Sequence, residues 1–126
     1  MADWWQWSPK REDESLTFAV VGVGRFGTAV CRELISNGAE VLAADSSEKA
    51  IDDLRQLEPS IEARVIDCTD EESMRESGIL EMNTVVVGIS EPIEASITTT
   101  LIAKDSEGTK VKRVIARATS DLHEKM

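Results

Sequence analysis

The chain has 126 residues, the length of one ordinary domain, so we expect a single hydrophobic core and no separate catalytic domain. Apolar residues make up 41% of the chain, but none of their runs approaches the roughly 20 residues that a membrane-spanning helix needs. The formal net charge of -10 argues against nucleic acid as a partner, because that affinity comes from clustered Lys and Arg side chains. Cys31 and Cys68 form no CxxC or Cys/His pattern, so we expect no metal or redox site and expect both to be buried in a reducing compartment. The first residues show no secretory signal pattern, so we expect a cytoplasmic protein.

The chain divides into two parts by its sequence pattern. Residues 1–15 match neither helical nor strand periodicity, and they contain all three tryptophans. We expect this segment to be an N-terminal arm that is partly disordered, or that packs on a partner chain or a membrane interface. Residues 16–126 alternate between short β-branched runs and amphipathic stretches, which is typical of parallel strands joined by crossover helices.

Five strands are predicted in this second part. Each is nearly continuous in apolar residues, as expected of strands that are covered on both faces. The predicted strands are Leu16–Val23, Glu40–Ala44, Ala63–Asp67, Thr84–Ile89 and Val111–Ala116. The pattern favours the α/β class, with a Rossmann-like, doubly wound parallel sheet of strand order 3-2-1-4-5.

Helices are predicted between the strands. The third begins with a capping box formed by Thr69 and Glu72, and Ser90 is the expected N-cap of the fourth. A last helix begins near Ser120, and because the sequence stops within that pattern we expect a sixth strand to be missing. The apolar positions that define the first, second and fourth helices are Phe26, Val30 and Leu34; Ala50, Ile51, Leu54 and Leu57; and Ile93, Ile97 and Leu101.

The segment Gly22–Gly27 carries the strongest functional signal. Its GxGxxG pattern is weak by itself, but here it follows a predicted strand, opens an amphipathic helix and precedes Asp45 by 18 positions. The first glycine permits a tight turn, the second lets phosphate approach the backbone, and the third lets helix and strand pack closely. The helix N-terminus then supplies main-chain N–H groups to the phosphates of a bound nucleotide.

Two acidic residues are expected near this turn. The carboxylate of Asp45, at the end of the second strand, can accept hydrogen bonds from ribose hydroxyls, and it would repel the 2′-phosphate of NADP. The alternative for Asp45 is a helix cap or loop acid, although Ser46 and Ser47 could cap the next helix themselves. Asp67 ends the third strand and can face the ligand crevice, with a solvated loop acid as its alternative.

Three further residues have two possible roles each. Arg25, inside the glycine turn, could reach a terminal phosphate or a ligand of a partner subunit, or it could be a solvent-exposed side chain. Ser90 could line the crevice or cap the next helix. Arg117, at the end of the fifth strand, could face the phosphates or form a surface ion pair.

The segments Val21–Gly27, Asp67–Asp70 and Val87–Ser90, together with Asp45, resemble the RCK domains (KTN or TrkA-N domains) of potassium-transport regulatory subunits. The resemblance is strongest to Ktr-type subunits, and the Gly-Arg-Phe-Gly turn is more specific than the bare glycine pattern. It implies a cytoplasmic, nucleotide-sensing subunit that binds NAD(H) or ATP/ADP and assembles as dimers, in an octameric ring, beneath a membrane potassium transporter or channel. The expected cofactor-binding residues are Gly22, Val23, Gly24, Arg25, Phe26, Gly27, Asp45, Ser46, Asp67, Cys68, Thr69, Ser90 and Arg117.

Some features depart from the family or leave another function open. Cys68 stands where the family usually has alanine, and the second ligand-binding lobe is absent from the sequence. The alternative function is an NAD-binding fragment of a dehydrogenase, because the same glycine pattern serves those enzymes. The chain contains no tyrosine and a single histidine, His123, so it offers few groups for acid–base catalysis, and no catalytic residue is predicted.

Overall fold

The computed structural model describes residues 16–116 of the chain. The predicted N-terminal arm, Arg117 and the helix predicted near Ser120 lie outside these residues. None of the helices in the described range is long and apolar enough to cross a membrane.

A parallel sheet of five strands forms the centre of the described domain, and helices cover both of its faces. The strands are β1 (Thr17–Val21), β2 (Glu40–Asp45), β3 (Glu62–Val65), β4 (Thr84–Val87) and β5 (Arg113–Ala116). The helices are α1 (Arg25–Ser36), α2 (Glu48–Leu57), α3 (Glu71–Ser77), the short 3-10 helix η1 (Ile79–Glu81) and α4 (Ile93–Asp105). The order β3-β2-β1-β4-β5 and the Rossmann-like, doubly wound class are confirmed.

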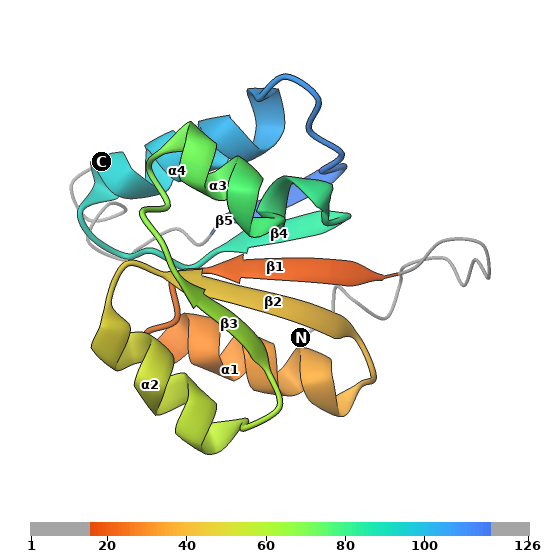
Figure 1. Ribbon diagram of the computed structural model, residues 1–126, viewed down its shortest axis with the longest axis vertical. Coiled ribbons are helices and arrows are strands. Elements are labelled where there is room, and N and C mark those ends of the chain that lie inside the picture. The colour runs from red at the N-terminus through yellow and green to blue at the C-terminus, as the bar shows by residue number, and fades with distance from the viewer. Residues whose placement is uncertain (1–15, 117–126) are drawn as a thin grey trace, which may run out of the picture.

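The two faces of β1 build two separate apolar cores, because successive side chains of a strand point to opposite faces. Phe18 and Val20 pack with buried residues of α1 and α2, whereas Ala19 and Val21 pack with Met74 of α3 and with α4. Figure 1 shows α1 and α2 on one side of the sheet, with α3 and α4 on the other. The chain therefore crosses from one face to the other after β3, between the α2 and α3 crossovers.

Strand burial differs between the centre and the edges of the sheet. All four residues of β4 are buried, as are four of the five residues of β1. In β3 only Ala63 is buried, and β5 has no fully buried residue. The expectation that every strand is covered on both faces is therefore wrong for β3 and β5, the two outer strands of the described sheet. β3 also ends at Val65, so Asp67 belongs to the loop that follows it.

The predicted helix caps need two corrections. The N-cap of α3 is Asp70, whose carboxylate accepts from the Ser73 amide at 2.9 Å, and not Thr69. The Thr69 hydroxyl donates to the Asp67 carboxylate at 2.6 Å, so it is engaged elsewhere. Ser90 does not cap α4, because that helix starts after Pro92 and has no side-chain cap.

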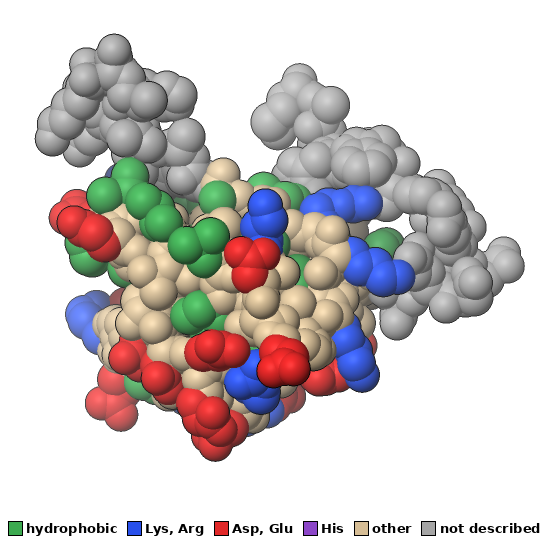
Figure 2. All heavy atoms as spheres, turned by 90° about the horizontal axis from the view of Figure 1, so that it is seen from above, with side chains coloured by type: hydrophobic (Ala, Val, Ile, Leu, Met, Phe, Trp, Pro, Cys, Tyr) green, Lys and Arg blue, Asp and Glu red, His purple; other side chains and the backbone are tan. Residues whose placement is uncertain are grey.

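The apolar stripe of α4 also differs from the prediction. Its buried side chains are Thr99 and Ala103, which lie on the face toward the sheet. Ile93, Ile97 and Leu101 are 37%, 54% and 52% exposed and lie on the opposite side of the helix. Small residues allow α4 to pack close to β4 and β5, which leaves the large apolar side chains on the outer surface. Hydrophobic side chains are seen gathered on the face of the molecule that carries α4 (Figure 2).

Candidate functional site

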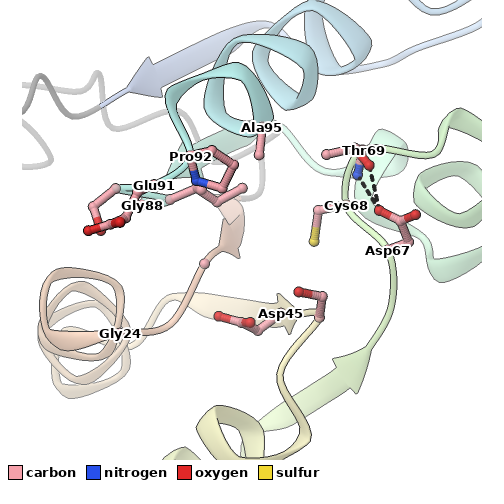
Figure 3. A pocket seen from close by; sticks show the side chains of 13 residues that line it. Gly24, Asp45, Asp67, Cys68, Thr69, Gly88, Glu91, Pro92 and Ala95 are labelled. Atoms are coloured by element: carbon pink, nitrogen blue, oxygen red, sulfur yellow. Dashed lines mark hydrogen bonds between the residues drawn. The ribbon is translucent and has the colours of Figure 1, made fainter.

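A cavity of about 260 Å³ lies at the carboxyl ends of the strands, where the chain leaves β1 toward one face of the sheet and β4 toward the other. Crevices of this kind, where neighbouring strands feed opposite faces, are the usual ligand sites of open α/β sheets. Figure 3 shows that the lining side chains come from four loops and from the start of α4. The lining residues are Gly22, Gly24, Asp45, Ser46, Asp67, Cys68, Thr69, Gly88, Ile89, Ser90, Glu91, Pro92 and Ala95.

The turn after β1 depends on glycines that pack against one another. Gly22 has a φ of 92°, a conformation that favours glycine, and its amide donates to the Ala44 carbonyl of β2 at 2.8 Å. A Cβ atom at Gly27 would overlap the carbonyl oxygen of Gly22, and one at Gly88 would come within 2.8 Å of the same oxygen. Side chains at these positions would therefore push α1 and β4 away from the turn.

The start of α1 lies next to the cavity, and no side chain caps it. α1 begins at Arg25, and its N-cap residue Gly24 makes no side-chain hydrogen bond to it. The first N–H groups of a helix have no partner within the helix, and the helix dipole places partial positive charge there. Apart from its two neighbours in the chain, no residue has an atom within 4 Å of a Cβ built on Gly24, so the approach to the start of the helix is open. This arrangement suits a phosphate group.

Asp45 joins the glycine turn to the next helix through both of its carboxylate oxygens. Oδ2 accepts from the main-chain amide of Val23, and Oδ1 accepts from that of Ser47, each at 2.8 Å. Ser47 is the N-cap of α2, as one of the sequence alternatives expected. A carboxylate has about four acceptor positions, so Asp45 keeps capacity for ribose hydroxyls while it supports the turn.

The loop after β3 forms the opposite end of the cavity. Both the amide and the hydroxyl of Thr69 donate to Asp67, at 3.0 and 2.6 Å. These two hydrogen bonds, of which the one from the hydroxyl has the larger effect, hold the pKa of the Asp67 carboxyl below its ordinary value. The Asp67 carboxyl is therefore ionised at neutral pH. Burial, with smaller contributions from the charges of Asp45 and Asp67, raises the pKa of the Cys68 thiol to about 12. The Cys68 sulfur points into the cavity as a neutral thiol (Figure 3).

The cavity collects eight of the thirteen residues predicted to bind a cofactor: Gly22, Gly24, Asp45, Ser46, Asp67, Cys68, Thr69 and Ser90. Phe26 and Gly27 are packed behind the turn, Phe26 against the core on the α1 side. Val23 and Arg25 line a different hollow, of about 500 Å³, between α1 and α2. Arg25 is therefore on the outside of the turn within this chain, and Arg117 lies outside the described residues.

Apart from Ser90, the second wall of the cavity was not predicted from the sequence. Gly88, Ile89, Glu91 and Pro92 follow β4, and Ala95 lies on the first turns of α4. The signal was present in the strand order, since a sheet of order 3-2-1-4-5 places the loop after β4 beside the glycine turn. Gly88, which directly follows the buried apolar strand β4, marks the same close approach.

The described lining of the cavity carries only negatively charged side chains. Asp45, Asp67 and Glu91 are acidic, and none of the described lining residues is Lys or Arg. Attraction for an anion must therefore come from main-chain N–H groups at the start of α1.

The sequence of residues 18–126 matches the family model described as the TrkA-N domain. The chain belongs to the TrkA-N domain family. It is 38% identical over 109 residues to the Ktr system potassium uptake protein C of Bacillus subtilis, an alignment that covers 86% of this chain and 47% of that protein. It is 40% identical over 89 residues to the Ktr system potassium uptake protein A of Vibrio alginolyticus, covering 71% of this chain and 40% of the relative. The chain thus spans less than half the length of these curated relatives.

Solved structures share the fold of this TrkA-N chain at low sequence identity. The NAD(P)-binding domain of an exopolyphosphatase-related protein from Archaeoglobus fulgidus superposes with a TM-score of 0.67 and 22% identity, covering 86% of this chain and 77% of that one. The TrkA-N domain of the inner membrane protein ybaL from Escherichia coli gives a TM-score of 0.66 at 19% identity, covering 88% and 80%. The Rossmann-like architecture is common to all three.

Proposed function

We propose that this chain is a nucleotide-sensing regulatory subunit or domain of a potassium uptake system, which couples a bound adenine nucleotide to gating of a membrane partner. The observation that carries the proposal is the cavity formed by the glycine turn, the uncapped start of α1 and the Asp45 carboxylate. The NAD(P)-binding domain with the same fold supports the proposal of nucleotide binding. The Ktr relatives support the proposal of a role in potassium uptake. The ligand is NAD(H) or ATP/ADP, since both carry an adenosine ribose and a pyrophosphate.

The placement of the ligand follows from the order of the strands. The phosphates lie at the glycine turn after β1, where the first turn of α1 donates N–H groups. The ribose lies at the end of β2, where Asp45 accepts its hydroxyls. Because β3 is the next strand of the sheet, the adenine lies toward the Asp67–Thr69 loop.

We propose that the protein acts from the cytoplasm, peripheral to the membrane, through a membrane potassium transporter or channel subunit. Self-association into a dimer, and from dimers into an octameric ring, is part of the same proposal. Ile93, Ile97 and Leu101 supply an apolar surface on α4 for a second copy of the chain, because large apolar side chains gain free energy when they leave water. We also propose that Arg25, on the outside of the glycine turn, contacts a neighbouring chain or its ligand in the assembly.

A regulatory role fits the chemistry of the cavity better than catalysis. Its described lining offers carboxylates, Cys68, Thr69 and Ser90, and the Cys68 thiol stays protonated at neutral pH. Among the residues that the structure describes, none on this lining is a Tyr, His or Lys of the kind that moves protons in many dehydrogenases. The alternative of an NAD-binding dehydrogenase fragment predicts turnover of NADH with some substrate, which the regulatory proposal does not.

Regulation of this kind requires that the nucleotide bind two assembly states with different affinity, and couplings of about 1 to 3 kcal/mol are typical. The test is calorimetric titration of the purified chain with NAD+, NADH, ADP and ATP, with light scattering of each ligand state. We expect at least one of these nucleotides to bind and to change the distribution of oligomers. Absence of binding by all four would refute the proposal, and NADH turnover would favour the enzyme alternative.

A further inference from the structure

Thr99 directs its side chain to an element far away in the sequence. It lies in the middle of α4, is fully buried, and donates a hydrogen bond of 2.9 Å to the main-chain carbonyl of Cys68. A threonine hydroxyl inside a helix commonly bonds the carbonyl of the preceding turn. Its neighbour Thr100 does this, donating to the Ser96 carbonyl at 2.8 Å. Thr99 therefore makes a contact between elements, whereas Thr100 makes a contact within the helix.

The loop that receives the Thr99 hydrogen bond forms the β3 end of the cavity. Asp67, Cys68 and Thr69 all line it. The Thr69 amide and hydroxyl and the Asp70 amide bond to Asp67, so these hydrogen bonds lie within the loop. The bond from Thr99 instead ties the loop to α4, across the cavity from β3.

The same face of α4 forms a wall of the cavity. Ala95, one turn before Thr99, lines the cavity beside Pro92, and Figure 3 shows it opposite the loop that carries Cys68. The separation between Ala95 and the Cys68 loop sets the width of the cavity at the end where we place the adenine. The Thr99 hydroxyl is the polar contact that spans these two walls one helical turn deeper.

We propose that Thr99 is a positioning residue for the nucleotide: its hydroxyl holds the Asp67–Thr69 loop at the distance from α4 that the adenine requires. This inference rests on the proposed nucleotide site. Without the hydroxyl, the buried Cys68 carbonyl loses its partner, and a buried acceptor without a partner is unfavourable. The loop then shifts toward water or another donor, and the adenine slot loses its shape.

The test compares Thr99→Val with Thr100→Val, because valine keeps the side-chain shape and removes one hydroxyl from adjacent positions of the same helix. We expect Thr99→Val to raise the Kd of ADP or NAD+ about tenfold, which corresponds to about 1.4 kcal/mol. Thr100→Val should leave the Kd within about twofold of the wild type, and Thr99→Ser, which keeps a hydroxyl, should restore most of the affinity. Inorganic pyrophosphate, which lacks the adenosine, should bind Thr99→Val and the wild type equally.

Equal nucleotide affinity of the two valine variants would overturn the inference. An equal loss of pyrophosphate affinity in Thr99→Val would overturn it as well, because the effect would then extend to the glycine turn. If the wild type binds none of the nucleotides, the proposed function fails, and amide hydrogen exchange of Thr69 and Asp70 decides whether Thr99 holds the loop. Faster exchange in Thr99→Val than in Thr100→Val supports that contact, and equal exchange refutes it.

Discussion

Replacement of Asp45 by alanine is expected to weaken the binding of adenine nucleotides while the sheet remains folded. The carboxylate already accepts from the main-chain amides of Val23 and Ser47, each at 2.8 Å, and its remaining acceptor positions are assigned to the ribose hydroxyls. A hydrogen bond to a charged group contributes about 1.5 to 3 kcal/mol, so the loss should raise the Kd roughly 10- to 150-fold. Calorimetric titration with ADP and NAD+ measures this change directly.

Two comparisons separate ribose recognition by Asp45 from other effects of the substitution. Inorganic pyrophosphate has no ribose, so its affinity should change less than that of ADP. Asp52→Ala removes the same charge from α2, where the side chain is 61% exposed, and should leave both affinities unchanged. An unchanged Kd for ADP in Asp45→Ala would remove Asp45 from the ribose site. Equal losses for pyrophosphate and ADP would show that Asp45 acts through the Val23 amide alone.

Gly27→Ala should lower the thermal midpoint of unfolding steeply, because its Cβ would overlap the Gly22 carbonyl oxygen. Gly24→Ala should fold normally and weaken phosphate binding. Equal thermal midpoints for the two variants would contradict this prediction. Alkylation of Cys68 should keep accelerating between about pH 8 and pH 10, since burial and two carboxylates raise its pKa to about 12. The alkylation rate is measured by mass spectrometry, and a rate that levels off near the ordinary thiol pKa would contradict this prediction. Ile97→Ser should reduce self-association in light scattering, while Leu57→Ser, an equally exposed change on α2, should not.

The sequence predicted the centre of the molecule better than its edges. The apolar runs of β1 and β4 and the glycine turn between β1 and α1 are local features, and the structure places them as expected. The ends of β1, β3 and β4, the start of β5 and the caps of α3 and α4 were predicted wrongly. Several side chains near these ends could each cap a helix, and small energetic differences choose among them. At α3 the Thr69 hydroxyl bonds to Asp67, which leaves Asp70 as the cap.

The sequence also could not show which face of α4 is buried. Ile93, Ile97 and Leu101 repeat at helical spacing, and so do the smaller Ala95, Thr99 and Ala103. The tertiary structure turns the small residues toward the sheet and the cavity, because α4 has to pack close to β4 and β5. Periodicity alone therefore favoured the wrong stripe.

The sequence by itself determined the alternation of strands and helices, the glycine turn and the acid at the end of β2, because each depends on residues close together in the chain. Only the tertiary structure decided that Glu91, Pro92 and Ala95 form a wall of the cavity, and that Thr99 bonds to Cys68 31 positions away. It also placed Arg25 outside this cavity, on the far side of the turn. Contacts between distant segments depend on how the helices pack on the sheet, and no local pattern of residues records that packing.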